Sequence, residues 1–280
     1  MNFLTQYISE ELYIRHAFDE CPYDRDFAMH IHEQYEIFYF ISGEAEYLVE
    51  GSRYPLRSGS LLIMKPAESH KVKILDSKRY ERIAINFAAT VIDFIDPTHR
   101  LTEPFEDRPL GRGNLYLPSE FEGMQLAGAF SEIGSVTKDK HGSRTKALTY
   151  LFVVLDMISS AYKKRDTSEY LSPQILSERI MLYVNTHLFE ELSVPLLAKQ
   201  FFMSTSQFNR VFKQAAGASP WEYITIKRLT AAREKIRNGV SAQNACESCG
   251  FRDYSAFYRA YLKHFGCAPK MTVRQKATSA

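Results

Sequence analysis

The chain has 280 residues, of which 45% are hydrophobic, and this is enough apolar material for two cores. Its 19 Phe and 17 Tyr exclude a disordered chain, and no run approaches the roughly 20 apolar residues of a membrane span. The net charge of +2 combines two opposite parts: residues 172–280 hold 15 Lys and Arg against 7 Asp and Glu, a net of +8, and residues 1–171 hold 20 against 26, a net of −6. Such an uneven distribution favours a polyanion as the partner of the basic part.

Two features of the chain indicate its compartment. Residues 1–6 lack the basic and then apolar layout of a signal peptide. Cys21, Cys246, Cys249 and Cys267 form no disulfide framework, and the Cys246-x-x-Cys249 pair lacks two further ligands at zinc spacing, so we interpret both as buried structural thiols. We therefore expect a protein of the reducing cytoplasm that does not associate with membranes.

Short strands separated by glycine turns are predicted between residues 26 and 90. The alternating segments are residues 36–40, 44–49, 54–56, 61–64, 72–75 and 82–87. Many short strands with turns at close intervals indicate a small β-barrel or jelly roll.

Four residues in this part of the chain have the spacing of metal-ligating or ligand-binding side chains. His30-x-His32-x-x-x-Glu36 is followed at longer range by His70, and the glycines and proline between them stand at Gly43, Gly59 and Pro66. This arrangement resembles the two cupin motifs, in which metal-binding members use two His and a Glu from the first motif and one His from the second. His30 and His32 occupy alternate strand positions and point to the same side, so the geometry allows both to coordinate one Zn, Fe or Ni ion.

Two roles remain for the four residues. The chain departs from the cupin pattern at Asp24, where a Gly is usual, and at Ile74, where an Asn is frequent. We therefore expect His30, His32, Glu36 and His70 to line a pocket for a small-molecule effector, or to serve as structural hydrogen-bonding groups, without a cofactor. A metal in the barrel is the alternative.

A helical pattern follows over residues 125–164. Its wide apolar stripe recurs at steps of three and four residues and comprises Leu148, Leu151, Phe152, Leu155 and Ile158. We predict that Leu148, Leu151, Phe152 and Leu155 form a dimer interface; packing against the chain's own barrel is the alternative. Residues 163–169 are typical of a polar linker.

The basic part contains two helix-turn-helix patterns. An amphipathic helix over residues 176–188 precedes the first pair, in which Ser204 is the predicted N-cap of the second helix. A helix over residues 220–237, with a Pro near its start and a Gly after its end, joins this pair to the next. The second pair spans residues 241–265, and Asp253 is its N-cap.

These residues resemble the two-module DNA-binding domain of the AraC/XylS family of bacterial transcription regulators, over roughly residues 175–274. The first module matches at Leu197, Ala198, Ser204, Phe208, Arg210, Phe212, Lys213, Gly217, Pro220, Tyr223, Arg228, Leu229 and Ala232. The second matches at Gly250, Phe251, Asp253, Ser255, Phe257, Arg259, Phe265, Gly266 and Pro269. The chain departs from the family pattern at Lys235, Tyr261 and Met271-Thr272-Val273.

The resemblance implies which side chains meet DNA. In the family, exposed early residues of each recognition helix touch base edges, and the alternative for any one of them is a contact with phosphate or water. Carried over to this chain, with Lys213 added on the open side of the first helix, the positions are Ser206, Gln207, Asn209, Arg210, Lys213, Tyr254, Ser255, Tyr258 and Arg259.

The sequence thus predicts an α+β multidomain protein, with an N-terminal cupin or jelly-roll β-barrel and dimerisation helices before an all-α tandem helix-turn-helix domain. Its predicted parts are an effector domain over residues 1–115, a dimerisation segment over 116–165, a linker over 166–173 and a DNA-binding domain over 174–280. We expect a transcription regulator, not an enzyme, that binds promoter double-stranded DNA and a small-molecule effector as a homodimer and can meet RNA polymerase. The alternative is a metal-dependent cupin enzyme with a basic accessory domain.

Overall fold

The computed structural model describes residues 2–93, 95–137, 142–166 and 175–272. Its internal contacts divide the chain into two compact units. The first unit comprises Met1–Ala28 and Gln34–Ser172, and the second comprises Met29–Glu33 and Pro173–Ala280. The predicted linker over residues 166–173 lies outside the described residues, apart from Asp166.

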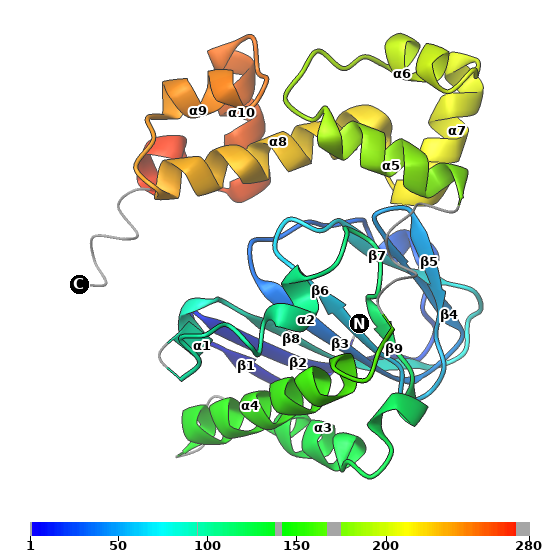
Figure 1. Ribbon diagram of the computed structural model, residues 1–280, viewed down its shortest axis with the longest axis vertical. Helices are drawn as coiled ribbons and strands as arrows, with labels where there is room; N and C mark the ends of the chain where they lie inside the picture. The colour runs from blue at the N-terminus through cyan, green and yellow to red at the C-terminus, as the bar shows by residue number, and fades with distance from the viewer. Residues whose placement is uncertain (1, 94, 138–141, 167–174, 273–280) are drawn as a thin grey trace. The chain divides into compact units, whose positions relative to one another are not determined.

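The first unit is built on two antiparallel sheets (Figure 1). A six-stranded sheet has the order β1-β2-β8-β3-β6-β9, and a three-stranded sheet has the order β5-β4-β7. The strands are β1 (Asn2–Ile8), β2 (Leu12–Asp19), β3 (Tyr35–Ser42), β4 (Ala45–Val49), β5 (Ser52–Pro55), β6 (Leu61–Met64), β7 (His70–Ile74), β8 (Tyr80–Phe87) and β9 (Leu115–Tyr116). The predicted fold class is confirmed, and the described strands pair as two sheets and not as one closed barrel.

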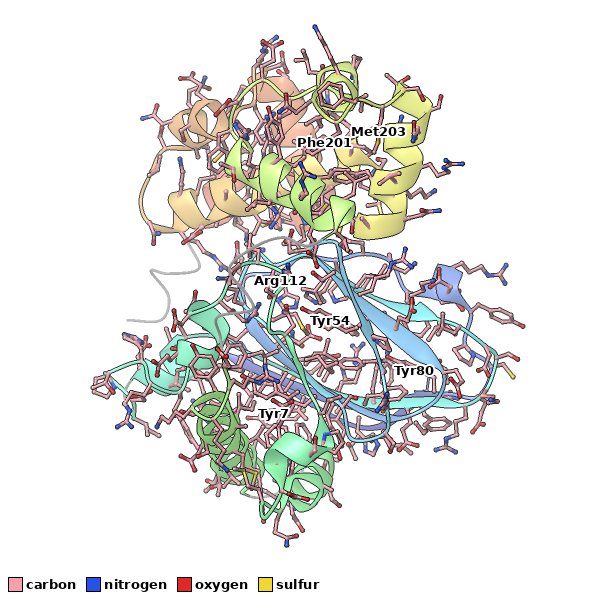
Figure 2. All side chains as sticks on the ribbon, turned by 45° about the vertical axis from the view of Figure 1, so that its right-hand side comes forward. Tyr7, Tyr54, Tyr80, Arg112, Phe201 and Met203 are labelled. Carbon is pink, nitrogen blue, oxygen red and sulfur yellow. The ribbon has the colours of Figure 1, made fainter. Side chains whose placement is uncertain are left out.

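Alternation along β3 separates two cores. Phe38 and Phe40 pack with Tyr47 of the three-stranded sheet in the space between the two sheets. Ile37 lies on the other side of β3, in a second core shared with the helices. This is the consequence of the two-residue repeat of a strand, because successive side chains point to opposite faces. Tyr80 (Figure 2) is buried in the first of these cores.

Helices cover the outer face of the six-stranded sheet (Figure 1). The first unit contains α1 (Thr90–Asp93), α2 (Glu103–Glu106), α3 (Leu126–Gly134) and α4 (Ser143–Tyr162), with short 3-10 turns at Asp24–Asp26 and Pro118–Phe121. The buried residues of α4 share a core with Ile37 of β3 and with Tyr7 of β1, which Figure 2 labels on this side of the sheet. The predicted apolar stripe therefore has a covering surface within its own unit.

Three strands escaped the sequence analysis, namely β1, β2 and the two-residue β9. β1 and β2 form an antiparallel hairpin, and β2 adds it to the six-stranded sheet by pairing with β8, with Ile14 opposite Ile85. Leu12, Ile14 and Ala17 are buried, whereas the residues between them are half-buried. The alternation in β2 is short and includes charged residues, which weakens its signal as a strand.

The second unit is helical and contains the two predicted helix pairs. Its helices are α5 (Leu176–Thr186), α6 (Val194–Gln200), α7 (Thr205–Ala216), α8 (Pro220–Arg237), α9 (Ala242–Ser248) and α10 (Tyr254–Phe265). The pairs α6–α7 and α9–α10 lie at the two ends of α8 (Figure 1). Phe208 and Phe212 of α7, and Phe257 and Tyr261 of α10, are fully buried, as their spacing predicts.

Candidate functional site

The helices of the second unit begin at side-chain caps. Ahead of each of α6 to α10 stands a Ser or Asp whose side-chain oxygen accepts a hydrogen bond from a backbone amide three residues later, namely Ser193, Ser204, Ser219, Ser241 and Asp253. Such caps satisfy an amide that would otherwise lack a partner at the first turn. Ser204 and Asp253 therefore fix where α7 and α10 start, as the sequence predicts.

The turns after α6 and α9 repeat one backbone geometry. α6 ends at the C-cap Phe201 with φ −102° and ψ 15°, and α9 ends at Cys249 with φ −100° and ψ 15°. The next residues, Phe202 and Gly250, have φ values of 55° and 79°. The amides of Phe202 and Gly250 each donate to the carbonyl oxygen three residues earlier, both at 3.1 Å. The amide of the next residue donates to the carbonyl oxygen five residues before it, at 2.9 Å in the first turn and 3.1 Å in the second. The two turns are thus copies of one Schellman motif.

The predicted DNA-facing residues lie on the open sides of α7 and α10. Eight of the nine are exposed, and Tyr254 is half-buried between Phe257 and Tyr258. The exposed set comprises Ser206, Gln207, Asn209, Arg210, Lys213, Ser255, Tyr258 and Arg259. Each recognition-type helix therefore buries its aromatic stripe and presents a face of hydroxyl, amide and cationic groups.

Arg228 of α8 ties the segment between α5 and α6 to the second helix pair. Its guanidinium donates to the carbonyl oxygens of Leu188 at 2.7 Å and Glu190 at 2.6 Å, which lie between α5 and α6, and to that of Gly250 at 2.8 Å, which lies between α9 and α10. A Cβ on Gly250 would lie 3.0 Å from the Arg228 Cζ and 2.8 Å from the Phe189 carbonyl oxygen. Burial lowers the pKa of Arg228 from its ordinary value, but an arginine stays charged in proteins.

Two of the departures from the family pattern satisfy each other. The Tyr261 hydroxyl and the Thr272 hydroxyl lie 2.8 Å apart, and both residues are buried. A third departure, Lys235, donates to the Ser248 hydroxyl at 2.9 Å. Cys246 and Cys249 are buried as predicted, and burial raises the pKa of both thiols, which disfavours the reactive thiolate.

The first unit contains a buried histidine–carboxylate pair. His70 Nε2 lies 3.2 Å from Glu36 Oε2, and Glu36 also accepts hydrogen bonds from Asn86 Nδ2 at 2.9 Å and from the Tyr47 hydroxyl at 3.5 Å. His70 Nδ1 lies 2.8 Å from the Glu68 carbonyl oxygen. Burial alone would lower the pKa of His70, but the Glu36 carboxylate beside it holds that pKa above its ordinary value. The pair therefore presents a polar, charge-bearing patch at the edge of an apolar interior.

The other two predicted residues, His30 and His32, lie in the segment Met29–Glu33, which groups with the second unit, and their ring centroids are 5.9 Å apart. Three imidazoles and a carboxylate are a donor set that zinc or iron accepts. Glu36 and His70 are hydrogen-bonded to each other, so this pair can bind a polar ligand group by hydrogen bonds alone.

Asn86 is a member of this site that the sequence analysis missed. It pairs with Glu36 in the ladder between β3 and β8, so both side chains leave the sheet on the same face. The signal was present, because Asn86 is the polar residue in the run Ile85-Asn86-Phe87 of a buried strand.

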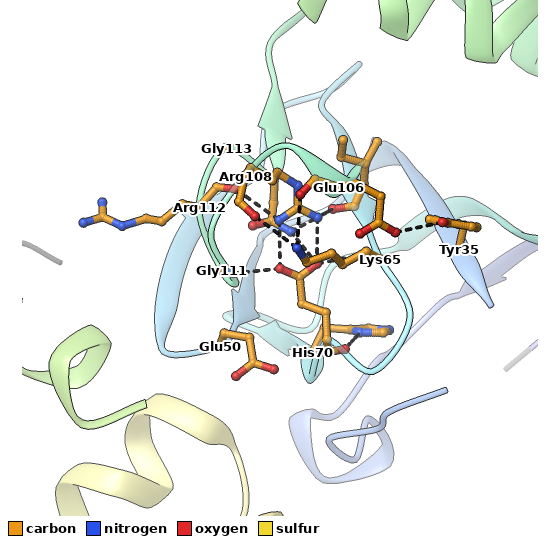
Figure 3. Close-up of polar contacts among 12 residues, drawn as sticks. Tyr35, Glu50, Lys65, His70, Glu106, Arg108, Gly111, Arg112 and Gly113 are labelled. Carbon is orange, nitrogen blue, oxygen red and sulfur yellow. Dashed lines mark hydrogen bonds and ion pairs between the residues drawn. The ribbon is translucent and has the colours of Figure 1, made fainter. Parts of the chain in front are cut away.

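A second polar cluster, also missed, holds the loop after α2 against the turn before β7 (Figure 3). The Glu68 carboxylate accepts hydrogen bonds from both terminal nitrogens of Arg108, at 2.8 and 2.7 Å, from the Gly111 amide at 2.7 Å, from the Lys65 amide at 3.1 Å and from Asn114 Nδ2 at 3.1 Å. Burial alone would raise the pKa of Glu68, but Arg108 and the two amides hold that pKa below its ordinary value. This fully satisfied carboxylate fixes the backbone that bonds His70.

The predicted dimer residues fall into two pairs. Leu151 and Leu155 are fully buried in the core between α4 and the six-stranded sheet, so they have no surface left for a partner. For these two residues the alternative, packing within the chain's own domain, describes the observed contacts. Leu148 and Phe152 are partly exposed and line a pocket of about 320 Å³, together with Tyr7, Ser9, Glu11, Leu12, Thr90, Val91, Ile95 and Arg144.

Both units match known families of domains. The AraC-like ligand binding domain family matches residues 16–117, and the helix-turn-helix domain family matches residues 197–275. The chain therefore combines an N-terminal ligand-binding domain with a C-terminal helix-turn-helix domain. It belongs to the AraC family of transcriptional regulators, as the sequence resemblance predicts.

Relatives of this family extend over nearly the whole chain. The uncharacterized HTH-type transcriptional regulator YdiP of Escherichia coli K12 is 22% identical, over 93% of this chain and 85% of its own length. The HTH-type transcriptional activator RhaR of Mannheimia succiniciproducens is 21% identical, over 95% and 93%. In both cases the match runs through the ligand-binding part as well as the helix-turn-helix part.

Solved structures also align with the chain. The structure of ToxT from Vibrio cholerae at 1.65 Å resolution is 12% identical with a TM-score of 0.41, and the match covers 94% of this chain and 98% of ToxT. The structure of unsaturated-fatty-acid-bound ToxT from strain SCE256 is 13% identical with a TM-score of 0.43, over 95% of both chains. Within the described residues, no helix has both the length and the apolar character needed to cross a membrane.

Proposed function

We propose that this AraC-family regulator reads promoter DNA with the open faces of α7 and α10, and that a small molecule bound in the first unit controls this reading. One observation carries the proposal: a capped helix pair occurs twice on one connecting helix, each time with a buried aromatic stripe and a polar, cationic open face. A helix-turn-helix module inserts its second helix into the major groove, and the N-terminal residues of that helix contact bases.

The residues of α7 fit this role chemically. Arg210 is exposed and suits a bidentate contact with guanine, and Asn209 or Gln207 suits adenine. Lys213, one turn further along the helix, suits a phosphate. In α10, Arg259 and Tyr258 offer a cation and a hydroxyl in equivalent places.

The length of α8 supports the use of both modules on one DNA duplex. Its 18 residues make a rod of about 27 Å. This is close to the roughly 34 Å that separates successive major-groove turns. The net charge of +8 on residues 172–280 supplies the attraction to phosphates.

For the effector we propose Glu36 and His70 of the first unit, with His30 and His32 as the further predicted ligands. An imidazole and a carboxylate that lie 3.2 Å apart, as in His70 and Glu36, can accept and donate hydrogen bonds to a ligand that carries hydroxyl or carboxyl groups. Coordination of a metal by the same four residues is the alternative. An enzyme built on that metal finds no support among the relatives, which bear the names of transcription regulators.

Dimerisation and cellular setting belong to the same proposal. Leu148 and Phe152 remain accessible on α4 and offer apolar area to a second copy of the chain. A homodimer would place two pairs of modules on repeated half-sites. We expect the protein to act in the cytoplasm, where it can meet RNA polymerase at the promoter.

The proposal is tested by selecting bound duplexes from a random DNA library with the full-length protein. A defined sequence should be enriched, and the affinity for it should fall by about 1000-fold or more between 50 and 200 mM salt if six or more phosphates are contacted. Failure to enrich any sequence, together with a flat salt response, would reject the proposed function. Turnover of a substrate by metal-loaded protein would support the cupin enzyme instead.

A further inference from the structure

The copied turns of the two modules differ in the residue at the left-handed position. The second module has Gly250 at the left-handed position, where φ is 79°, and the first module has Phe202 there, with φ 55°. Glycine adopts this region without steric cost, whereas a bulky side chain brings its Cβ close to the following carbonyl oxygen. The second module therefore shows that the turn itself does not need a side chain, and that Phe202 adds strain to it.

The strained residue also exposes its aromatic ring. Phe202 is 98% exposed, the largest exposure among the exposed large hydrophobic residues that the structure describes. Its neighbours Phe201 and Met203, which Figure 2 labels, are half-buried. Phe202 thus contributes nothing to the apolar core, and folding of the second unit would be served better by glycine. A residue that is strained and unburied at once points to a function outside folding.

Position and charge indicate the partner. Phe202 stands two residues before Ser204, the N-cap of α7, and so at the end of the recognition helix that meets base edges. Residues 192–221 around it hold Lys199, Arg210 and Lys213 and no Asp or Glu. A surface of this charge complements DNA, and an aromatic ring can pack against a thymine methyl group or the face of a sugar.

We propose, on the basis of the proposed DNA-reading function, that Phe202 makes an apolar contact with the duplex at the border of the segment read by α7. This contact gives the first module a preference, for thymine above all, that the second module lacks. In the left-handed conformation of the turn the ring is exposed to solvent and available for the contact.

The test compares full-length variants in selection from a random duplex library and in thermal unfolding. Phe202→Gly and Phe202→Asn both tolerate the left-handed conformation and remove the ring, and Phe202→Tyr retains the ring. Leu182→Ala removes a side chain that is 52% exposed on α5, outside both helix pairs, and serves as the control.

The first two variants should unfold at a temperature about 4 °C higher, bind the wild-type site about tenfold more weakly and lose base preference at one or two adjacent positions. The Tyr and control variants should keep wild-type affinity and preference. Unchanged affinity and an unchanged selected sequence for Phe202→Gly would overturn the proposal. Unchanged DNA binding with a loss of promoter activation would also overturn it and would assign the ring to a protein partner. If the wild-type protein selects no sequence, the proposed function fails as well, so the two failures are distinguishable.

Discussion

Replacement of Arg228 by Met tests what holds the two helix-turn-helix modules in one unit. Methionine keeps most of the unbranched side-chain length but removes all the donors that serve Leu188, Glu190 and Gly250. We expect the second unit to lose stability because carbonyl groups ahead of the first module and within the second lose their common partner. The first unit should be unaffected, since Arg228 makes these contacts within the second unit.

The size of the effect follows from the contacts. Each buried carbonyl that loses its donor costs about 1 kcal/mol or more, which gives about 3–5 kcal/mol for the set. Arg228 is 7% exposed, so removing its charge also returns part of the free energy spent on desolvating it. We therefore expect a net loss of about 3 kcal/mol. With a urea dependence of about 1.5 kcal/mol per molar for a domain of this size, the midpoint falls by about 2 M.

The assay is urea unfolding of the full-length protein, followed by fluorescence and circular dichroism. The sequence has 1 Trp, and it is Trp221 at the start of α8, so its fluorescence reports on the second unit. Arg252→Met is the matched control, because the Arg252–Glu191 ion pair is exposed on both sides (78% and 67%) and should contribute little. If the midpoint of Arg228→Met stays within about 0.5 M of that control, the guanidinium does not hold the modules together and the reasoning is wrong.

Three further outcomes are expected. Arg210→Ala should weaken binding to the selected site by about 1–3 kcal/mol and relax base preference there, as measured by DNA titration; an equal loss on random DNA would make Arg210 a phosphate contact. Glu68→Gln should destabilise the first unit by about 3 kcal/mol at pH 7 in urea unfolding. Because folding lowers the pKa of Glu68, this stabilisation is fully present above the unfolded-state pKa of about 4.3 and is lost as the pH falls through the folded-state pKa. The urea midpoints of the two proteins should therefore converge in acid, and a constant difference between them at acidic pH would contradict this. Elemental analysis of protein purified without added metal should find well under one equivalent of Fe, Ni, Zn or Mn, and a stoichiometric metal that disappears in His32→Ala or His70→Ala would refute the effector assignment in favour of a metal site.

The helices of the second unit could be predicted because their signals are local. Ser204 and Asp253 cap helices that begin at the next residue, and the aromatic stripe of each helix repeats within three turns. Such features need no knowledge of distant chain segments. The strands between residues 35 and 87 were predictable for the same reason, since alternation and glycine turns lie within a few residues of each other.

The polar networks could not be read from the sequence, because their members lie far apart in it. Glu68 and Arg108 are separated by 40 residues, and Glu36 and Asn86 by 50. Only the pairing of β3 with β8 brings Asn86 opposite Glu36. A sequence pattern gives the period of a strand but not its neighbour in the sheet.

The helix α4 shows a related limit. Its apolar stripe predicts that Leu151 and Leu155 are covered, but the period of a helix does not say whether the cover is the same chain or another copy. The six-stranded sheet covers these two residues, whereas Leu148 and Phe152 stand at the border of the covered surface. The width of the stripe therefore predicted that these residues are covered, but the sequence could not tell which surface covers them.

The hydroxyl pair of Tyr261 and Thr272 has a consequence for how such chains diverge. Each hydroxyl is buried and has the other as its partner. Reverting either position alone would leave one hydroxyl unsatisfied at a cost of about 1 kcal/mol or more, whereas replacing both by apolar residues of matching shape would cost little. The two substitutions are therefore expected to be inherited together, so that descendants of this chain should carry both hydroxyls or neither. Thr272, which lies beyond the end of α10, thus constrains which aromatic residue the last recognition helix can accept.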